Sequence, residues 1–138
     1  LLNISCQIND KYLTNYWSDG LIISTPTGST GYSLSNGGSI VSPESNVIVL
    51  NPIAPHNINM RSLVIPDNSK INIDIEGDSD INLSLDSRMY SANCSNQIEI
   101  FKAGFTIGTI KFDNDNFYKR LREKLFWGQD MRNQNLNR

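Results

Sequence analysis

Short runs in which every second residue is apolar recur along most of this chain, and they constrain its fold more than any other feature. Ile71, Ile73 and Ile75 alternate with polar residues, and residues 81–85 repeat the pattern. Such alternation gives a strand one buried face and one exposed face. Similar runs follow at short intervals with Asn, Asp and Gly between them, which favours antiparallel pairing. The sequence therefore predicts a mainly β, layered, antiparallel, sandwich-like domain.

The same runs give the boundaries of the expected strands. Strands are predicted at 1–8, 12–17, 21–23, 47–50, 63–66, 70–75, 81–85, 97–101 and 105–112. Asn9, Asp10 and Lys11 supply a turn that joins the first two strands as a hairpin. The β-branched run at 47–50 is of the type that is buried on both faces.

The last part of the chain changes to a four-residue apolar period. Phe117, Leu121 and Leu125 follow this spacing, which predicts a C-terminal amphipathic helix. Residues 113–115 are expected to cap its start, and Gly128 is expected to end it. Because neither an internal repeat nor a linker interrupts the sequence, residues 1–138 are expected to form a single domain.

A loop rich in hydroxyl groups and glycine follows the apolar run at 21–23. Residues 24–38 contain seven Ser and Thr side chains and four glycines. Pro26 and Gly28 end the strand pattern, and the residues after them can begin one short helix whose backbone N–H groups face a ligand. Such a surface suits sugar hydroxyls, amides, nucleobases or phosphate. The alternative is a surface turn, since these residue types also dominate turns for conformational reasons.

The residues of this loop resemble the signature of the NAD kinases. The match consists of D-G-L-I-I-S-T-P-T-G-S-T-G-Y-S-L-S at 19–35 and Gly-Gly at 37–38, with N-P-I-A-P-H at 51–56 and R-S-L-V at 61–64 resembling later segments. The chain departs at Gly31, where the family usually has Ala. By this resemblance the chain is the C-terminal, NAD-binding domain of a two-domain kinase. That kinase phosphorylates the adenosine-ribose 2′-hydroxyl of NAD, using ATP or polyphosphate, and so makes NADP.

The resemblance also assigns candidate residues to the NAD site. These are Asp19, Thr27, Thr30, Gly31, Tyr32, Ser35 and Ala54. Asp19 would lie near the nicotinamide end of the dinucleotide, the loop residues would line the adenine and ribose pocket, and Ala54 would leave room for the ligand. Asp19 can also be read as a turn cap, and Tyr32 as a core aromatic. Asp86 is a further candidate and equally a hairpin-turn residue.

No catalytic residue is expected in this chain. The family's base lies in a G-G-D-G motif of an N-terminal α/β domain, and this sequence has no such motif. Because the chain begins at Leu1 rather than Met, we expect an excised or truncated domain that is inactive alone. The resemblance implies Mg²⁺ or another divalent cation with ATP in the full-length enzyme, and none bound to this part alone. It also implies contact with the enzyme's own N-terminal domain and assembly into a dimer or tetramer.

Composition argues against other classes of partner. Lys and Arg total 12 against 14 acidic residues, a net charge of −2 without a basic stripe, so nucleic acid is not an expected partner. Cys6 and Cys94 lack metal-type spacing and are expected as reduced, half-buried thiols, with no metal site. His56 is the only histidine and is expected to be a hydrogen-bonded structural residue. With neither a signal peptide nor a long apolar run, a soluble, cytoplasmic protein without membrane contact is expected.

Two other functions remain open at this point. The sandwich domain of a lipid or sphingoid kinase would need an apolar cleft, which a loop dense in hydroxyls does not favour, and S-T-P-T-G-S-T is not its pattern. A non-catalytic carbohydrate- or nucleotide-binding β module would fit the missing catalytic motif equally well.

Overall fold

A computed structural model describes residues 1–77, 80–94, 97–110 and 116–128 of the chain. The chain divides into two compact units, Leu1–Gly104 and Phe105–Arg138, which are described separately below. The expectation of a single domain over residues 1–138 therefore stays a prediction.

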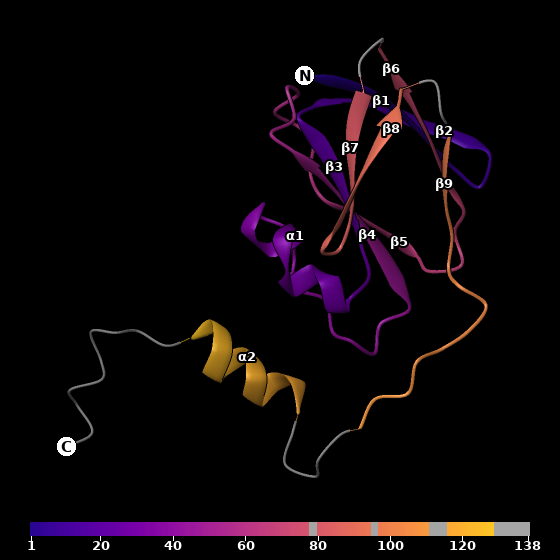
Figure 1. Ribbon diagram of the computed structural model, residues 1–138. Helices are drawn as coiled ribbons and strands as arrows, with labels where there is room; N and C mark the ends of the chain where they lie inside the picture. The colour runs from indigo at the N-terminus through magenta and orange to yellow at the C-terminus, as the bar shows by residue number, and fades with distance from the viewer. Residues whose placement is uncertain (78–79, 95–96, 111–115, 129–138) are drawn as a thin grey trace, which may run out of the picture. The chain divides into compact units, whose positions relative to one another are not determined.

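The first unit is built from antiparallel sheets, as the alternating runs predict (Figure 1). Sheet A has the order β2-β1-β6-β9 and consists of β1 (Leu2–Ile8), β2 (Lys11–Ser18), β6 (Ile71–Glu76) and β9 (Ile98–Ile100). Sheet B has the order β3-β4-β5 and consists of β3 (Gly20–Ser24), β4 (Val47–Ile53) and β5 (Leu63–Pro66). A separate hairpin contains β7 (Asp80–Leu85) and β8 (Arg88–Asn93).

One apolar core joins sheets A and B. Sheet A contributes the side chains that alternate towards this core, among them Ile4, Cys6 and Ile73, and sheet B contributes Ile48 and Leu50. A shared core between two sheets gives the layered arrangement that the sequence predicts. The two strands at its centre, β1 in sheet A and β4 in sheet B, each have a neighbour on both sides.

Strand β4 is buried on both of its faces. Ile48 and Leu50 point into the shared core, whereas Val49 and Asn51 alternate to the opposite face and are also buried. The expectation for the run at 47–50 is therefore confirmed. The opposite face must be covered by another part of the chain, and the loop described below covers it.

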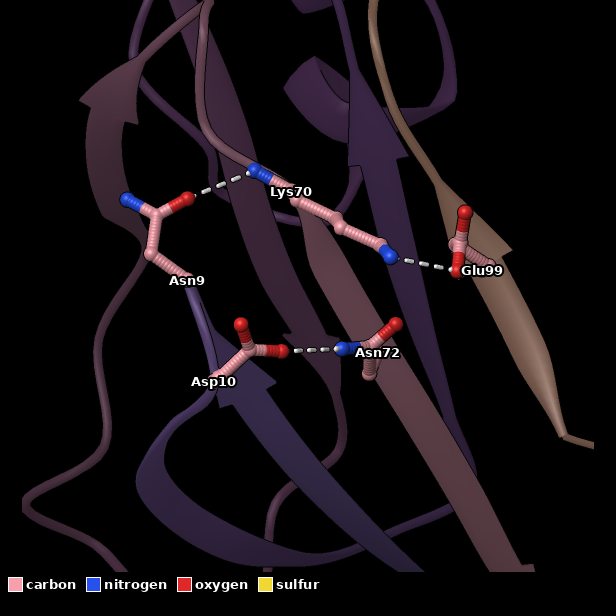
Figure 2. Close-up of polar contacts among 5 residues, drawn as sticks. All are labelled: Asn9, Asp10, Lys70, Asn72 and Glu99. Carbon is pink, nitrogen blue, oxygen red and sulfur yellow. Dashed lines mark hydrogen bonds and ion pairs between the residues drawn. The ribbon is translucent and has the colours of Figure 1, made fainter.

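A polar cluster joins the tip of the β1–β2 hairpin to β6 and β9 (Figure 2). The Asn9 N–H donates to the Lys70 carbonyl at 2.9 Å, and Asn9 Oδ1 accepts from the Lys70 N–H at 2.9 Å. Lys70 Nζ lies 2.8 Å from Glu99 Oε2, and the hydrogen bond that it donates to Glu99 raises the pKa of Lys70. Asp10 Oδ1 accepts from Asn72 Nδ2 at 3.5 Å. Since the Lys70–Glu99 pair is exposed, the two hydrogen bonds between Asn9 and the Lys70 backbone contribute most to holding this turn in place.

The structure corrects two strand predictions. Strand β8 is not among the expected strands, because five of its six residues are exposed and it lacks an apolar alternation. Residues 105–110 form no strand although their sequence alternates, and no described strand pairs with them. Alternation supplies an apolar face, but a strand also needs a neighbouring strand for its backbone hydrogen bonds. Residues 111 and 112 of that prediction lie outside the described residues.

In the second unit, the C-terminal helix is confirmed as α2 (Phe117–Leu125). Its N-terminal cap is Asn116, whose Oδ1 accepts a hydrogen bond from the Lys119 N–H at 2.8 Å. The caps predicted at 113–115 lie outside the described residues. The helix ends before Gly128, because Phe126 takes a left-handed conformation with φ of 53°. Neither this helix nor any other described one is long and apolar enough to cross a membrane.

We expect the stability of the first unit to fall at alkaline pH because of Cys6 and Tyr16. Burial raises the pKa of the Cys6 thiol from 9.0 to about 11. Burial, and then the charge of the nearby Cys6, raise the pKa of the Tyr16 hydroxyl from 10.0 to about 12. Unfolding returns both groups to water, so the unfolded state releases protons first as the pH rises. The contribution of these two groups to the free energy of unfolding is therefore fully present below about pH 9 and is lost between about pH 9 and 12.

Denaturant midpoints measured from about pH 7 to 11 test this expectation. The variant Cys6→Ala should flatten the loss that begins near pH 9, whereas Val49→Ala, which removes no titratable group, should keep it. A wild-type midpoint that stays constant across this range would contradict the expectation.

Candidate functional site

The loop rich in hydroxyls and glycine folds into two short helical turns directly after β3. The first is a 3₁₀ turn, η1 (Thr27–Thr30), and the second is the helix α1 (Tyr32–Ser35). The prediction of one short helix after the S-T-P-T-G-S-T segment is thus met by a 3₁₀ turn followed by one turn of α-helix. Figure 1 shows α1 near β4, where Asn51 of β4 hydrogen-bonds Ser33 of α1.

Two serines of the loop point inward and hold it together. Ser29 is fully buried, its Oγ donates to the Pro26 carbonyl at 2.6 Å, and it accepts from the Val41 N–H at 3.0 Å. Ser33 is 1% exposed and faces Asn51 of β4. An ordinary surface turn buries few of its hydroxyls. The inward serines therefore argue against the surface-turn interpretation.

Strand β4 holds the loop through a small buried polar group. Asn51 Nδ2 donates to the Ser33 carbonyl at 3.0 Å and approaches Ser33 Oγ at 3.3 Å. The Gly38 N–H donates to the same carbonyl at 2.8 Å. Just beyond α1, Asn36 Nδ2 donates to the Pro52 carbonyl at 2.8 Å. Sequence reasoning assigned no role to Asn51, although it begins the N-P-I-A-P-H segment and is a polar residue at the end of a run buried on both faces.

Several other residues of the loop are exposed to solvent, and they include every loop residue predicted for the NAD site. Those residues are Thr27, Thr30, Gly31, Tyr32 and Ser35, and all of them are exposed. The Tyr32 side chain is 66% exposed, so its interpretation as a core aromatic is wrong. The loop therefore presents hydroxyls, an aromatic ring and backbone on one surface, supported from behind by buried serines.

Gly31 lies at the junction of the two turns, where the chain departs from the usual Ala. Its N–H donates to the Gly28 carbonyl at 3.0 Å, and its own carbonyl accepts from Leu34 at 3.1 Å. A Cβ at this position would lie 3.3 Å from the Gly28 carbonyl oxygen. Alanine is therefore accommodated only if that carbonyl moves by a few tenths of an ångström.

The structure brings Asp19 and Ala54 together at the neighbouring ends of β3 and β4. The Asp19 N–H donates to the Ile53 carbonyl at 2.9 Å, which places Asp19 beside the residue that precedes Ala54. Ala54 takes a left-handed conformation with φ of 44° and is exposed. The Asp19 carboxylate makes no hydrogen bond or ion pair with any described residue, so its backbone rather than its side chain holds the turn. Since Asn36 binds Pro52, the end of α1 reaches this same end of β4.

The other candidate residues have separate positions. Asp86 begins the two-residue turn between β7 and β8 with φ of 52°, and Ser84 Oγ donates to its carbonyl at 3.0 Å. This agrees with the hairpin-turn interpretation, and no hydrogen bond among the described residues connects Asp86 to the loop. His56 is exposed. Its backbone N–H, rather than its imidazole, makes the hydrogen bond to the Trp17 carbonyl at 2.8 Å.

The cysteines and acidic residues of the described chain provide no evident metal site. Cys6 and Cys94 are both buried, more deeply than expected, and form no disulfide with each other. Within residues 1–77, 80–94, 97–110 and 116–128, no group of three or more His, Cys, Asp or Glu side chains could hold a metal ion. The described residues therefore do not offer enough ligating side chains to hold a metal ion without ligands from elsewhere.

Taken together, the two sheets and the loop define a β-rich domain that exposes a polar, glycine-rich loop. Residues 1–112 match the family described as the ATP-NAD kinase C-terminal domain. The chain belongs to that family.

Relatives and solved structures agree with this assignment. A protein named NAD kinase from Flavobacterium psychrophilum is 50% identical over 134 residues, which cover 96% of this chain and 46% of that protein. An NAD kinase from Bacteroides fragilis is 41% identical over 133 residues, again 96% of this chain and 46% of the relative. The chain thus spans about half the length of the curated relatives it matches.

Two crystal structures have a similar fold. Yeast NADH kinase complexed with NADH matches with a TM-score of 0.67 and 29% identity, over 94% of this chain and 41% of that one. An NAD kinase from Archaeoglobus fulgidus in complex with ATP matches with a TM-score of 0.67 and 28% identity, over 75% of this chain and 40% of that one.

We expect Gly38→Ala to destabilise the loop. A Cβ at residue 38 would lie 2.4 Å from Ser33 Oγ, 2.7 Å from the Ser33 carbonyl oxygen and 2.8 Å from Asn51 Nδ2. Overpacking of this kind costs about 1–3 kcal/mol in free energy of unfolding. Denaturant unfolding measures the change, with Gly104→Ala as the control because nothing lies within 4 Å of its Cβ position. Equal stability of the two variants would contradict this packing.

Proposed function

We propose that this chain is the NAD-binding part of an NAD kinase, an enzyme that phosphorylates the adenosine-ribose 2′-hydroxyl of NAD to form NADP. The observation that supports this most directly is the orientation of the loop. Ser33 is hydrogen-bonded to Asn51 of β4 and Ser29 is hydrogen-bonded to Val41, while the loop residues that the resemblance assigns to NAD are exposed to solvent. A lipid or sphingoid kinase domain is not supported, since this surface is polar and the chain belongs to another family.

The outward residues supply the contacts that a dinucleotide requires. The hydroxyls of Thr27 and Ser35 can each donate and accept hydrogen bonds to adenine edges and ribose hydroxyls. The Thr30 hydroxyl donates to the Thr27 carbonyl at 3.2 Å and can still accept from the ligand. The exposed ring of Tyr32 offers an apolar surface with a polar tip beside the ligand. At Gly31 a ligand can approach the backbone closely, because no side chain intervenes.

Asp19 and Ala54 would act at the other end of the dinucleotide. The Asp19 carboxylate has no partner among the described residues, so it is available to accept from a ribose hydroxyl or a carboxamide N–H. Ala54 is exposed and small, which leaves space for the ligand beside Asp19. We also retain Asp86 as a lesser candidate for ligand contact, in addition to its role in the turn.

The contribution of this chain to catalysis would be positioning. Phosphoryl transfer depends mainly on alignment of donor and acceptor and on neutralisation of charge. We propose that the base that takes the 2′-hydroxyl proton belongs to an N-terminal domain, because no residue of the loop fits that role. The divalent cation that accompanies ATP or polyphosphate would supply charge neutralisation, and its protein ligands would lie outside the residues described here.

The proposed enzyme is cytoplasmic and contains more than this chain. We propose that the chain contacts its own N-terminal domain and that the full protein forms a dimer or tetramer. Structures of related kinases with NADH and with ATP support dinucleotide and ATP as the small-molecule partners.

The first test of the proposed function measures NADP formation. The full-length protein that contains this chain should form NADP from NAD, ATP and Mg²⁺, whereas residues 1–138 alone should form none. Full-length protein that binds NAD without phosphorylating it would instead indicate a non-catalytic nucleotide-binding module. NADP formed by residues 1–138 alone, above a contamination control, would show that the base lies within this chain.

The second test replaces Asp19 by Asn in the full-length protein. The amide keeps the size of the side chain but loses its charge, so kcat/KM for NAD should fall about tenfold to a hundredfold. The stability should stay unchanged, because the backbone bond to Ile53 does not involve the carboxylate. Asp80→Asn, which changes an exposed carboxylate on β7, is the matched control. Normal kinetics with a lowered unfolding midpoint would return Asp19 to the role of a turn cap.

A further inference from the structure

A single buried amide attaches the inner side of α1 to sheet B. Asn51 is 4% exposed, and its Nδ2 lies 3.0 Å from the Ser33 carbonyl oxygen and 3.3 Å from Ser33 Oγ. The Gly38 N–H reaches the same carbonyl at 2.8 Å. Ser33 therefore receives two donors from behind, one from the strand and one from the chain that leaves the helix.

The length of α1 makes this attachment important. A helix of four residues forms few hydrogen bonds of its own and depends on tertiary contacts for its position. Tyr32 and Ser35 are three positions apart in the sequence and lie on one side of the turn, while Ser33 lies on the other side. Fixing Ser33 from behind consequently fixes the rotation of the turn, and with it the direction of Tyr32 and Ser35.

The surrounding contacts leave the turn little freedom to find another position. Asn36 Nδ2 holds the end of the turn to the Pro52 carbonyl at 2.8 Å. Close packing at Gly38 excludes even a Cβ, whose nearest contacts would be Ser33 and Asn51. Among the described residues, Asn51 is the side chain of β4 that hydrogen-bonds the inner face of α1.

We propose that Asn51 is a positioning residue for NAD binding, acting through Ser33 to hold Tyr32 and Ser35 in the orientation that contacts the dinucleotide. Asn51 is buried behind the loop and does not touch the ligand. The proposal rests on the proposed function, because it assigns Tyr32 and Ser35 to the NAD surface. It predicts that loss of the amide weakens NAD binding and leaves ATP binding and the phosphoryl-transfer step nearly unchanged.

The test compares Asn51→Ala with Asn72→Ala in the full-length enzyme. Asn72 is a matched control, since it is 8% exposed and its amide donates to Asp10, in sheet A. Steady-state kinetics give kcat and the KM values for NAD and ATP, calorimetry gives the Kd for NAD, and denaturant melts give the stability. Asn51→Ala should raise KM and Kd for NAD about three- to tenfold, the range for one lost hydrogen bond, with kcat and KM for ATP within about twofold. Asn72→Ala should leave all NAD constants unchanged, whatever its stability.

A second variant keeps the test decisive. If Asn51→Ala does not yield folded protein, Asn51→Ser retains a shorter donor and should show the same selective rise for NAD. An active wild-type enzyme whose Asn51 variants keep the wild-type KM for NAD would overturn this inference alone. Equal losses for NAD and ATP, or the same loss in Asn72→Ala, would also overturn it, because they indicate a general effect on the fold. A wild-type enzyme that neither binds nor phosphorylates NAD would overturn the proposed function together with the inference.

Discussion

The packing of β4 on both of its faces is the constraint on which both the core and the loop depend. On one face Ile48 and Leu50 join the apolar side chains of sheet A. On the other face Asn51 binds the helical turn that follows β3. Because successive side chains of a strand point to opposite faces, the register that buries Leu50 also directs Asn51 to the loop. A shift by one residue would lose the core and the loop attachment at once.

The two faces are held by different interactions. The core face uses burial of apolar area, which is nondirectional and tolerates exchanges of similar volume. The loop face uses hydrogen bonds of the Ser33 carbonyl and the amide of Asn51, which require defined distances and directions. Directional bonds specify the orientation of a short turn, whereas apolar contacts alone would allow it to rotate. This difference explains why a polar residue occupies a buried position in a strand that is otherwise apolar.

The sequence predicts the sheets well because alternation reports local burial, as in Ile71, Ile73 and Ile75. It cannot predict β8, since an exposed strand carries no alternation, or the absence of a strand at residues 105–110, since alternation alone does not supply the hydrogen-bonding partner that a strand needs. The candidate residues of the loop came from a resemblance to a family, and their exposure agrees with a surface role without testing it. The separation into inward and outward hydroxyls could not be predicted, because Ser29 and Thr30 look alike until the turn that contains them is known.

The separation of the loop into buried support and exposed surface also bears on how such a domain changes over evolutionary time. Thr27, Thr30 and Ser35 are exposed and lie outside the core, so substitutions there change the surface of the loop at little cost to folding. Ser29, Ser33 and Gly38 lack this freedom. A protein built in this way can change the chemistry of this surface while the same inner residues keep the loop intact. The inner residues are therefore expected to vary less than the outer ones among proteins that share this fold.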